Sequence, residues 1–103
     1  MNEVINLIQV IEVPDDLGGF DYEIESEAEV FAEKKSVSQK EFYLAMQSGL
    51  ETVAVFAVWF EDYNDERVIE HEEDFYTVTR TFRKGDKIHL TCTKRHGVFE
   101  EIK

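Results

Sequence analysis

The side chains that most often do chemistry in proteins are few in this sequence and far apart along it. The three histidines are His71, His89 and His96, and they lack the spacing of zinc ligands. His71 lies in the acidic run 70–74, the one stretch where a cation could bind. That run lacks the alternating ligands and the central glycine of a calcium loop. We therefore expect no metal ion and no cofactor.

Nucleophilic catalysis has equally little support in the sequence. The single cysteine, Cys92, falls in the expected strand 88–92, where a lone cysteine is typical of a small buried hydrophobe. The sequence contains no glycine-rich phosphate loop and no nucleophile elbow. Its many carboxylates follow one alternating strand face, and nothing indicates a closed pocket around a carboxylate pair. The sequence predicts that this protein is not an enzyme.

Charge is distributed unevenly along the chain, whose net value is −12. Residues 1–33 hold ten acids and no Lys or Arg, whereas residues 80–103 hold seven bases and three acids. A chain this acidic is repelled by phosphate, so tight binding to nucleic acid is disfavoured. The acidic first third and the basic last quarter suit head-to-tail contacts between copies. An open alternative is that both are solvated faces that serve solubility.

The elements that must position these residues form one small domain, residues 1–103, of mainly β class. The 43% hydrophobic content is that of a globular protein. Strands are expected over residues 4–13, 22–33, 52–60, 67–70, 75–82 and 87–93. Turns are expected at 14–19, 71–74 and 83–86, and residues 96–103 are expected to be less ordered. About six short strands with one inserted helix predict a small antiparallel β-barrel or rolled sheet.

Two of these strands have informative faces. From Tyr22 to Ala32, apolar and small residues alternate with acids, which predicts a half-buried strand with a row of outward carboxylates. That row guards against edge-to-edge aggregation or forms a contact surface. The run 53–60 is apolar on both faces, so it is either buried on both sides or in contact with another chain. At eight residues it is too short to span a bilayer.

The only expected helix covers residues 38–48. Ser38 and Glu41 form a capping box, Phe42, Ala45 and Met46 form an apolar stripe that packs on the sheet, and Gly49 ends the helix. Tyr43 and Gln47 lie on other faces of this helix and are interface candidates. The N-terminus lacks the pattern of a secretory signal, so folding in a reducing cytoplasm is expected.

The stretch 32–45, in which a strand ending in Ala-Glu precedes Ser-x-x-Glu-Phe-Tyr-x-Ala, resembles the head-closure (head–tail joining) proteins of long-tailed bacteriophages. The downstream order agrees: Gly49, an apolar strand, Arg67-Val68, then 75–78 and 88–92, so that roughly residues 4–95 are covered. The acidity of residues 1–33 is a departure from the family.

The resemblance implies a small β-barrel with one helix that forms a ring beneath the portal and its adaptor. Such a ring retains packaged DNA, which passes without tight binding, and provides the surface that the tail joins. Its partners would be portal and adaptor ring proteins and a tail-completion protein, with free subunits monomeric. It would reside in the virion and, during assembly, in the bacterial cytoplasm, with no membrane contact. A loop closes the channel in some members, and 14–21 and 61–66 are both candidates here.

Two alternatives stay open at this point. One is a monomeric acidic binding module, acting as a DNA mimic or as an inhibitor of a basic host protein. The other is a tail-completion protein one ring further down. The interface candidates from the sequence are Tyr43, Gln47, Glu23, Glu25, Glu27, Glu29, Arg83, Lys84 and Lys87.

Overall fold

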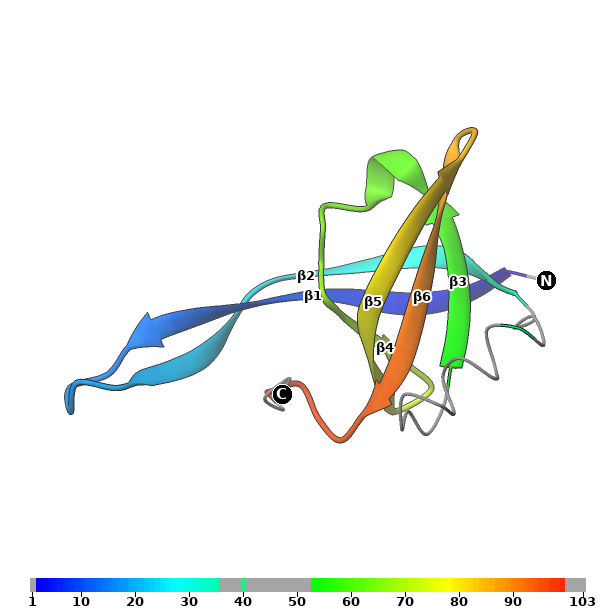
Figure 1. The fold of residues 1–103 in the computed structure, drawn as a ribbon. Coiled ribbons are helices and arrows are strands. Elements are labelled where there is room, and N and C mark those ends of the chain that lie inside the picture. Colours follow the sequence, from blue (N-terminus) through cyan, green and yellow to red (C-terminus); the bar gives the residue numbers. More distant parts are fainter. Residues whose placement is uncertain (1, 36–39, 41–52, 100–103) are drawn as a thin grey trace.

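Six antiparallel strands close into a barrel, as the alternating sequence predicts (Figure 1). The computed structural model describes residues 2–35, 40 and 53–99. The elements are β1 (Asn2–Pro14), β2 (Phe20–Lys35), β3 (Val53–Trp59), the 3-10 turn η1 (Phe60–Asp62), β4 (Val68–His71), β5 (Asp74–Lys84) and β6 (Lys87–Arg95). Their order around the barrel is β1-β2-β3-β6-β5-β4, and the mainly β fold class is confirmed.

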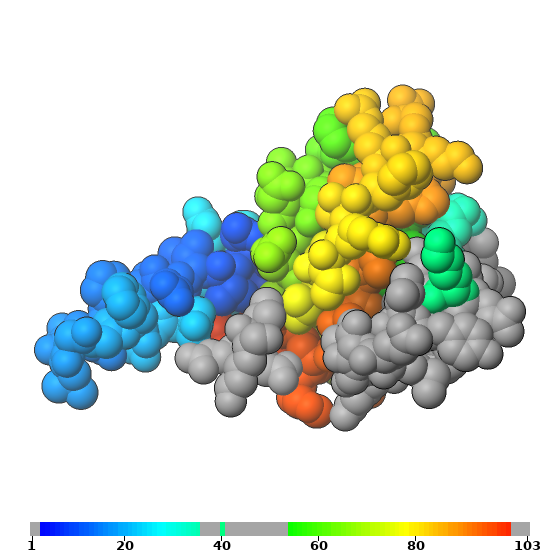
Figure 2. Space-filling view, in the orientation of Figure 1, coloured from blue at the N-terminus to red at the C-terminus, as the bar shows by residue number. Residues whose placement is uncertain are grey.

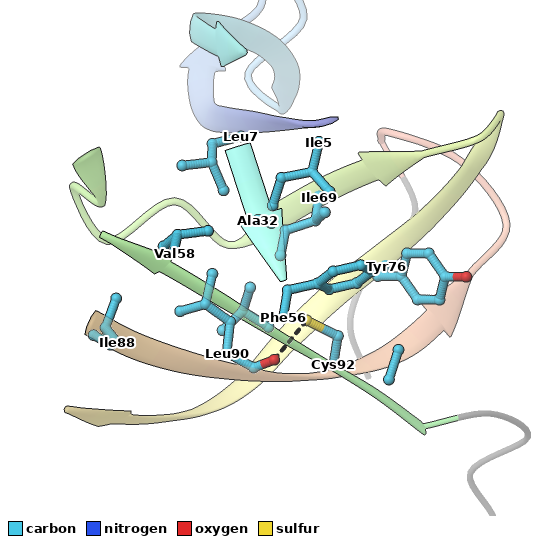
Figure 3. Packing of buried hydrophobic residues seen from close by; sticks show 12 residues of the cluster. Ile5, Leu7, Ala32, Phe56, Val58, Ile69, Tyr76, Ile88, Leu90 and Cys92 are labelled. Atoms are coloured by element: carbon cyan, nitrogen blue, oxygen red, sulfur yellow. Dashed lines mark hydrogen bonds between the residues drawn. The ribbon is translucent and has the colours of Figure 1, made fainter. Parts of the chain in front are cut away.

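The core fills the inside of the barrel with alternate residues from all six strands (Figure 3). Phe56 of β3 is fully buried there and meets the rings of His71 and Tyr76 edge-on, at centroid distances of 5.2 and 5.8 Å. Such edge-to-face packing adds to the free energy gained from burial. Because the sheet closes on itself, the barrel has no free edge strand.

Strand β3 is buried on both faces over residues 54–58. Ala54, Phe56 and Val58 belong to the core cluster, while Val55 and Ala57 point away from it and are buried as well. This confirms the first of the two readings of that apolar run. At the end of this apolar run the side chains are no longer buried: Trp59 and Phe60 are exposed.

Tight turns join the last three strands. Glu72 and Glu73, between β4 and β5, both have positive φ angles (50° and 70°), which matches the primed turns that two-residue hairpins favour. Gly85 supplies the positive φ (64°) in the turn between β5 and β6. Both turns were expected from the sequence.

The expected helix over residues 38–48 lies outside the described residues, apart from Lys40, which is helical and exposed. The residues assigned to this helix or its end, namely Ser38, Glu41, Phe42, Tyr43, Ala45, Met46, Gln47 and Gly49, therefore stay predictions. Among the described residues, no helix is long and apolar enough to cross a membrane.

The start of the C-terminal tail folds back on the end of β6. The buried guanidinium of Arg95 donates hydrogen bonds to the carbonyl oxygens of Gly97 (2.7 Å) and Val98 (2.8 Å). It also donates to Oγ1 of Thr77 at 3.0 Å. Residues 96–99 are thus attached to the barrel through Arg95.

Strands β1 and β2 form a long hairpin, of which only one half takes part in the barrel (Figure 1). β1 pairs with β4 only over residues 6–8, and β2 pairs with β3 only over residues 33–35. Apart from Glu27, which pairs with Ile8 at the edge of the barrel, residues 9–27 pair only with each other and project from the barrel as a two-stranded ribbon. We call this segment, residues 9–27, the arm.

Candidate assembly surfaces

The arm contains a β-bulge that reverses the predicted faces of β2. Gln9 pairs with Ser26 and Val10 pairs with Ile24, so Glu25 has no partner on β1. An unpaired extra residue shifts the alternation of side chains by one. The prediction that one face runs unbroken from Tyr22 to Ala32 is therefore wrong.

Beyond the bulge, apolar residues of β2 lie on the face that continues the outside of the barrel. Ile24 and Phe20 pair with Val10 and Pro14, on the same face as Ile8. Phe20 keeps 65% of its surface exposed, and Ile24 is exposed as well. The arm thus presents an apolar strip to solvent.

The same bulge divides the predicted row of carboxylates. Glu27 and Glu29 stay on the outer face of the barrel, where they pair with Ile8 and Asn6. Glu23 pairs with Ile11 and lies on the opposite face. All four glutamates of the prediction, Glu25 included, are exposed, but they do not form one continuous surface.

The end of the arm is an ordered loop that exposes a leucine. Oδ1 of Asp15 accepts hydrogen bonds from the amides of Leu17 (2.9 Å) and Gly19 (2.7 Å). Gly18 adopts a positive φ of 83°, which a residue without Cβ reaches at no steric cost. The loop holds Leu17 95% exposed.

The arm is also uniformly acidic. Residues 9–27 include seven Asp or Glu and no Lys or Arg. None of the ion pairs between residues that the structure describes involves a carboxylate of the arm. Glu27 accepts a hydrogen bond from Asn6, and Glu12 accepts one from Tyr22. The arm therefore carries a concentrated negative charge.

A second exposed region lies at the turn between β5 and β6 and combines aromatic and basic side chains from both faces of the sheet. Trp59 pairs with Lys87 on one face, whereas Arg83 pairs with Ile88 on the other. We call this region the tip patch; its members are Trp59, Phe60, Phe82, Arg83, Lys84 and Lys87. The Arg83 guanidinium lies over the Phe60 ring at 3.7 Å, and the Lys87 amine lies 5.0 Å from the centre of the Trp59 ring. These cation–π contacts hold charge and ring together at the surface.

The tip patch surrounds a shallow hollow of about 270 Å³, lined by Trp59, Phe60, Glu61, Arg83 and Asp86. A backbone hydrogen bond of 2.8 Å from the Phe60 amide to the Asp86 carbonyl fixes its two sides together. The hollow is smaller than the pockets that enclose drug-sized ligands. Three of its five lining residues are charged, and two of these, Glu61 and Asp86, are acidic.

The basic residues predicted as interface candidates all lie in this patch. Arg83 and Lys84 are exposed, and Lys87 lies 3.6 Å from the Glu33 carboxylate. Lys35, at 2.9 Å, and then Lys87 hold the pKa of Glu33 below its usual value. The aromatic members of the tip patch were not predicted from the sequence. They could have been found from the apolar run 53–60, because Trp59 and Phe60 end that run next to a polar connection, where a strand leaves the core.

Two groups in or against the barrel core, Cys92 and Tyr63, have strongly raised pKa values. Burial raises the pKa of the Cys92 thiol to about 12, in agreement with the expected small hydrophobe. Burial, and then the charges of Asp65 and Glu66, raise the pKa of Tyr63 to about 12. The Tyr63 hydroxyl donates to the Glu66 carbonyl at 2.8 Å. This hydrogen bond lies within the connection after η1, and the packing of Tyr63 against the core cluster links that connection to the barrel.

Among the residues that the structure describes, one group of possible metal ligands joins β1 to the end of β4 and the turn after it. Glu3, His71 and Glu72 each offer one ligand atom, all within 4.8 Å of one another. Nε2 of His71 is hydrogen-bonded to Glu3 at 3.0 Å, whereas Glu72 lies 4.0 Å away and is largely exposed. This geometry is that of a buried histidine that joins two strands, and the absence of a metal stays a prediction.

No protein-family model matches this chain, and no curated protein matches it. The described residues form a small closed β-barrel with a projecting acidic arm and a separate basic, aromatic patch. The described residues thus leave two separate exposed regions that combine charge with apolar side chains.

Proposed function

We propose that this chain is a non-catalytic head-closure protein of a tailed phage or prophage, which forms a ring beneath the portal and adaptor. The resemblance of residues 32–45 to that family motivates the proposal. The observation that carries it is the arm, a ribbon with exposed apolar side chains that has no partner strand among the described residues. In this role the chain would retain packaged DNA and provide the surface for tail attachment.

The arm is costly for a protein that works alone. A two-stranded ribbon is only marginally stable in water, and exposed apolar side chains promote unwanted association. Both costs disappear when the ribbon lies against another protein. The arm therefore supports a role in assembly.

The net charge agrees with a ring through which DNA moves. Each Lys or Arg contact to phosphate adds binding free energy that would hold the duplex in place. A chain of net charge −12 disfavours such contacts and repels the duplex instead. Packaged DNA would pass the ring without tight binding.

Reconstitution tests this proposal. The purified chain is mixed with portal–adaptor complexes and with tail-completion protein, and joined particles are counted by electron microscopy. We expect a ring below the adaptor. Failure to join, beside a head-closure protein that does join, would sink the proposal. Binding to tails alone would instead assign the chain to the tail-completion position.

The acidic binding module is the second candidate, and the concentrated charge of the arm favours it. The bulge at Glu25 argues against a flat carboxylate face, because it divides the row between the two faces of the arm. Replacing Glu23, Glu25, Glu27 and Glu29 by Gln should abolish capture of a basic host protein if this reading is correct. A head-closure protein would show no such capture before or after the change.

A further inference from the structure

We propose that the arm of one copy binds the tip patch of a second copy, so that copies join head to tail. The occupant of the tip patch is then Leu17 and the apolar strip of a neighbouring arm. This inference deepens the proposed function and rests on it, since it names the two surfaces through which neighbours in the ring would meet.

Charge complementarity is the first argument. The arm carries seven acids and no base, whereas residues 80–87 carry four bases and one acid. Opposite potentials steer two surfaces together and disfavour contacts between like ends. At the tip patch, Lys87 is paired with Glu33 and the acids Glu61 and Asp86 line the hollow, so Arg83 and Lys84 are the bases that would attract an arm. Two arms, by contrast, repel each other.

Matching apolar surface is the second argument. Leu17 at 95%, Phe20 at 65%, Trp59 at 47% and Phe82 at 63% exposure are among the most exposed large apolar side chains described. Aromatic and arginine side chains beside a pocket are typical of the residues that contribute most to binding. Trp59 and Phe60 supply the apolar part of the hollow beside Arg83, and Leu17 is the most exposed apolar side chain of the arm.

The positions of the two surfaces are the third argument. Figure 1 shows the arm projecting to the left of the barrel and the β5–β6 turn at its top, well apart from each other, and Figure 2 shows the arm projecting from the barrel. When the arm of each copy binds the tip patch of the next copy, the same contact can be made along a whole series of copies. The series closes into a ring if the rotation between neighbouring copies returns to the first copy, and otherwise it forms a filament.

Trp59 makes the contact measurable, because it is the only tryptophan of the chain and lies in the tip patch. An arm variant carries Leu17→Ser and Phe20→Ser and keeps an intact tip patch. A tip variant carries Trp59→Phe, Phe82→Ser, Arg83→Glu and Lys84→Glu and keeps an intact arm. All six positions are exposed, so both variants should fold, which circular dichroism and urea unfolding check.

The titration mixes the two variants at low ionic strength. Only the arm variant contains Trp59, so its indole N–H resonance and its emission report solely on a tip patch that receives an arm. We expect a saturable shift and a complex of one copy of each variant, because each has one working surface. Added salt should weaken the complex by about tenfold or more, since exposed charges are screened.

The control titrant carries both sets of substitutions and should produce no shift. The inference is overturned if Trp59 does not respond up to millimolar concentration, or if the control titrant shifts it equally. The outcome is separate from that of the reconstitution. A chain that joins portal–adaptor complexes but fails the titration uses another contact between copies, whereas the reverse result removes only the head-closure role.

Discussion

The barrel half and the arm half of the β1–β2 hairpin belong to the same two strands, yet their side chains have different surroundings. In the barrel half, Ile5 and Leu7 are buried among residues of all the other strands. In the arm half, Phe20 and Ile24 are exposed on a ribbon that pairs with no other strand. The outer face exposes apolar side chains in both halves, Phe31 (65%) as much as Phe20, so the difference is that only the barrel half buries its other face in a core.

Strands β1 and β2 are longer than closure of the barrel requires. A barrel closes through the pairing of residues 6–8 with β4 and of residues 33–35 with β3. Pairs beyond the bulge add no contact to that closure. We infer that the barrel supplies the stability of the protein and that the arm serves a partner.

A matched pair of phenylalanines gives the sharpest stability test of this difference. Phe56→Ala should lower the free energy of unfolding by about 3–5 kcal/mol, since it leaves a cavity in the core. Phe20→Ala in the arm should change it by less than about 0.5 kcal/mol. Urea unfolding followed by circular dichroism measures both. Equal effects would show that the arm is part of the folding core.

A pair of arginines extends the test to polar contacts. Arg95→Met should cost about 2 kcal/mol, because three oxygens at the end of the barrel lose a charged donor. Arg83→Met, at the exposed tip patch, should cost less than about 0.5 kcal/mol. A loss at Arg83 as large as that at Arg95 would assign the tip patch a structural role.

The pH dependence of stability should also arise in the barrel. The folded pKa of Cys92 is raised from 9.0 to about 12, so above pH 9 the unfolded state binds fewer protons than the folded state. Stability should therefore be fully present below pH 9 and decrease as the pH rises towards 12. Cys92→Ala should flatten this decrease in urea unfolding at a series of pH values. An unchanged slope would exclude the thiol as a cause.

Removing most of the arm should also have only a small effect on stability. A chain in which Asn-Gly joins Val10 to Ile24, with residues 11–23 deleted, keeps every pair that closes the barrel. Asn-Gly suits a two-residue hairpin turn. The free energy of unfolding should change by less than about 1 kcal/mol. A loss of several kcal/mol would show that the barrel depends on the arm.

Local sequence signals were sufficient for the strands and their turns. Alternation and turn residues located all six strands to within two residues at each end, and Gly85 marked a turn. Burial of Cys92 and of both faces of β3 also followed from the apolar character of those strands. These features depend on neighbours in the chain, which a sequence displays directly.

The faces of the arm could not be predicted in the same way. The alternation from Tyr22 to Ala32 is regular, and nothing in it indicates that Glu25 is a bulge. The bulge depends on how β2 pairs with β1, which is a property of two segments together. The tip patch likewise arises where β3 meets the β5–β6 turn, so Trp59 and Arg83 become neighbours only in the fold.

The most direct test of the account is to compare the full chain with the arm-shortened chain in the portal–adaptor reconstitution. The account predicts that the full chain forms a ring below the adaptor and that the shortened chain, equally stable, does not. If the shortened chain forms the same ring, the arm is not the assembly element. If neither chain joins, beside a working head-closure protein, the proposed function is wrong as well.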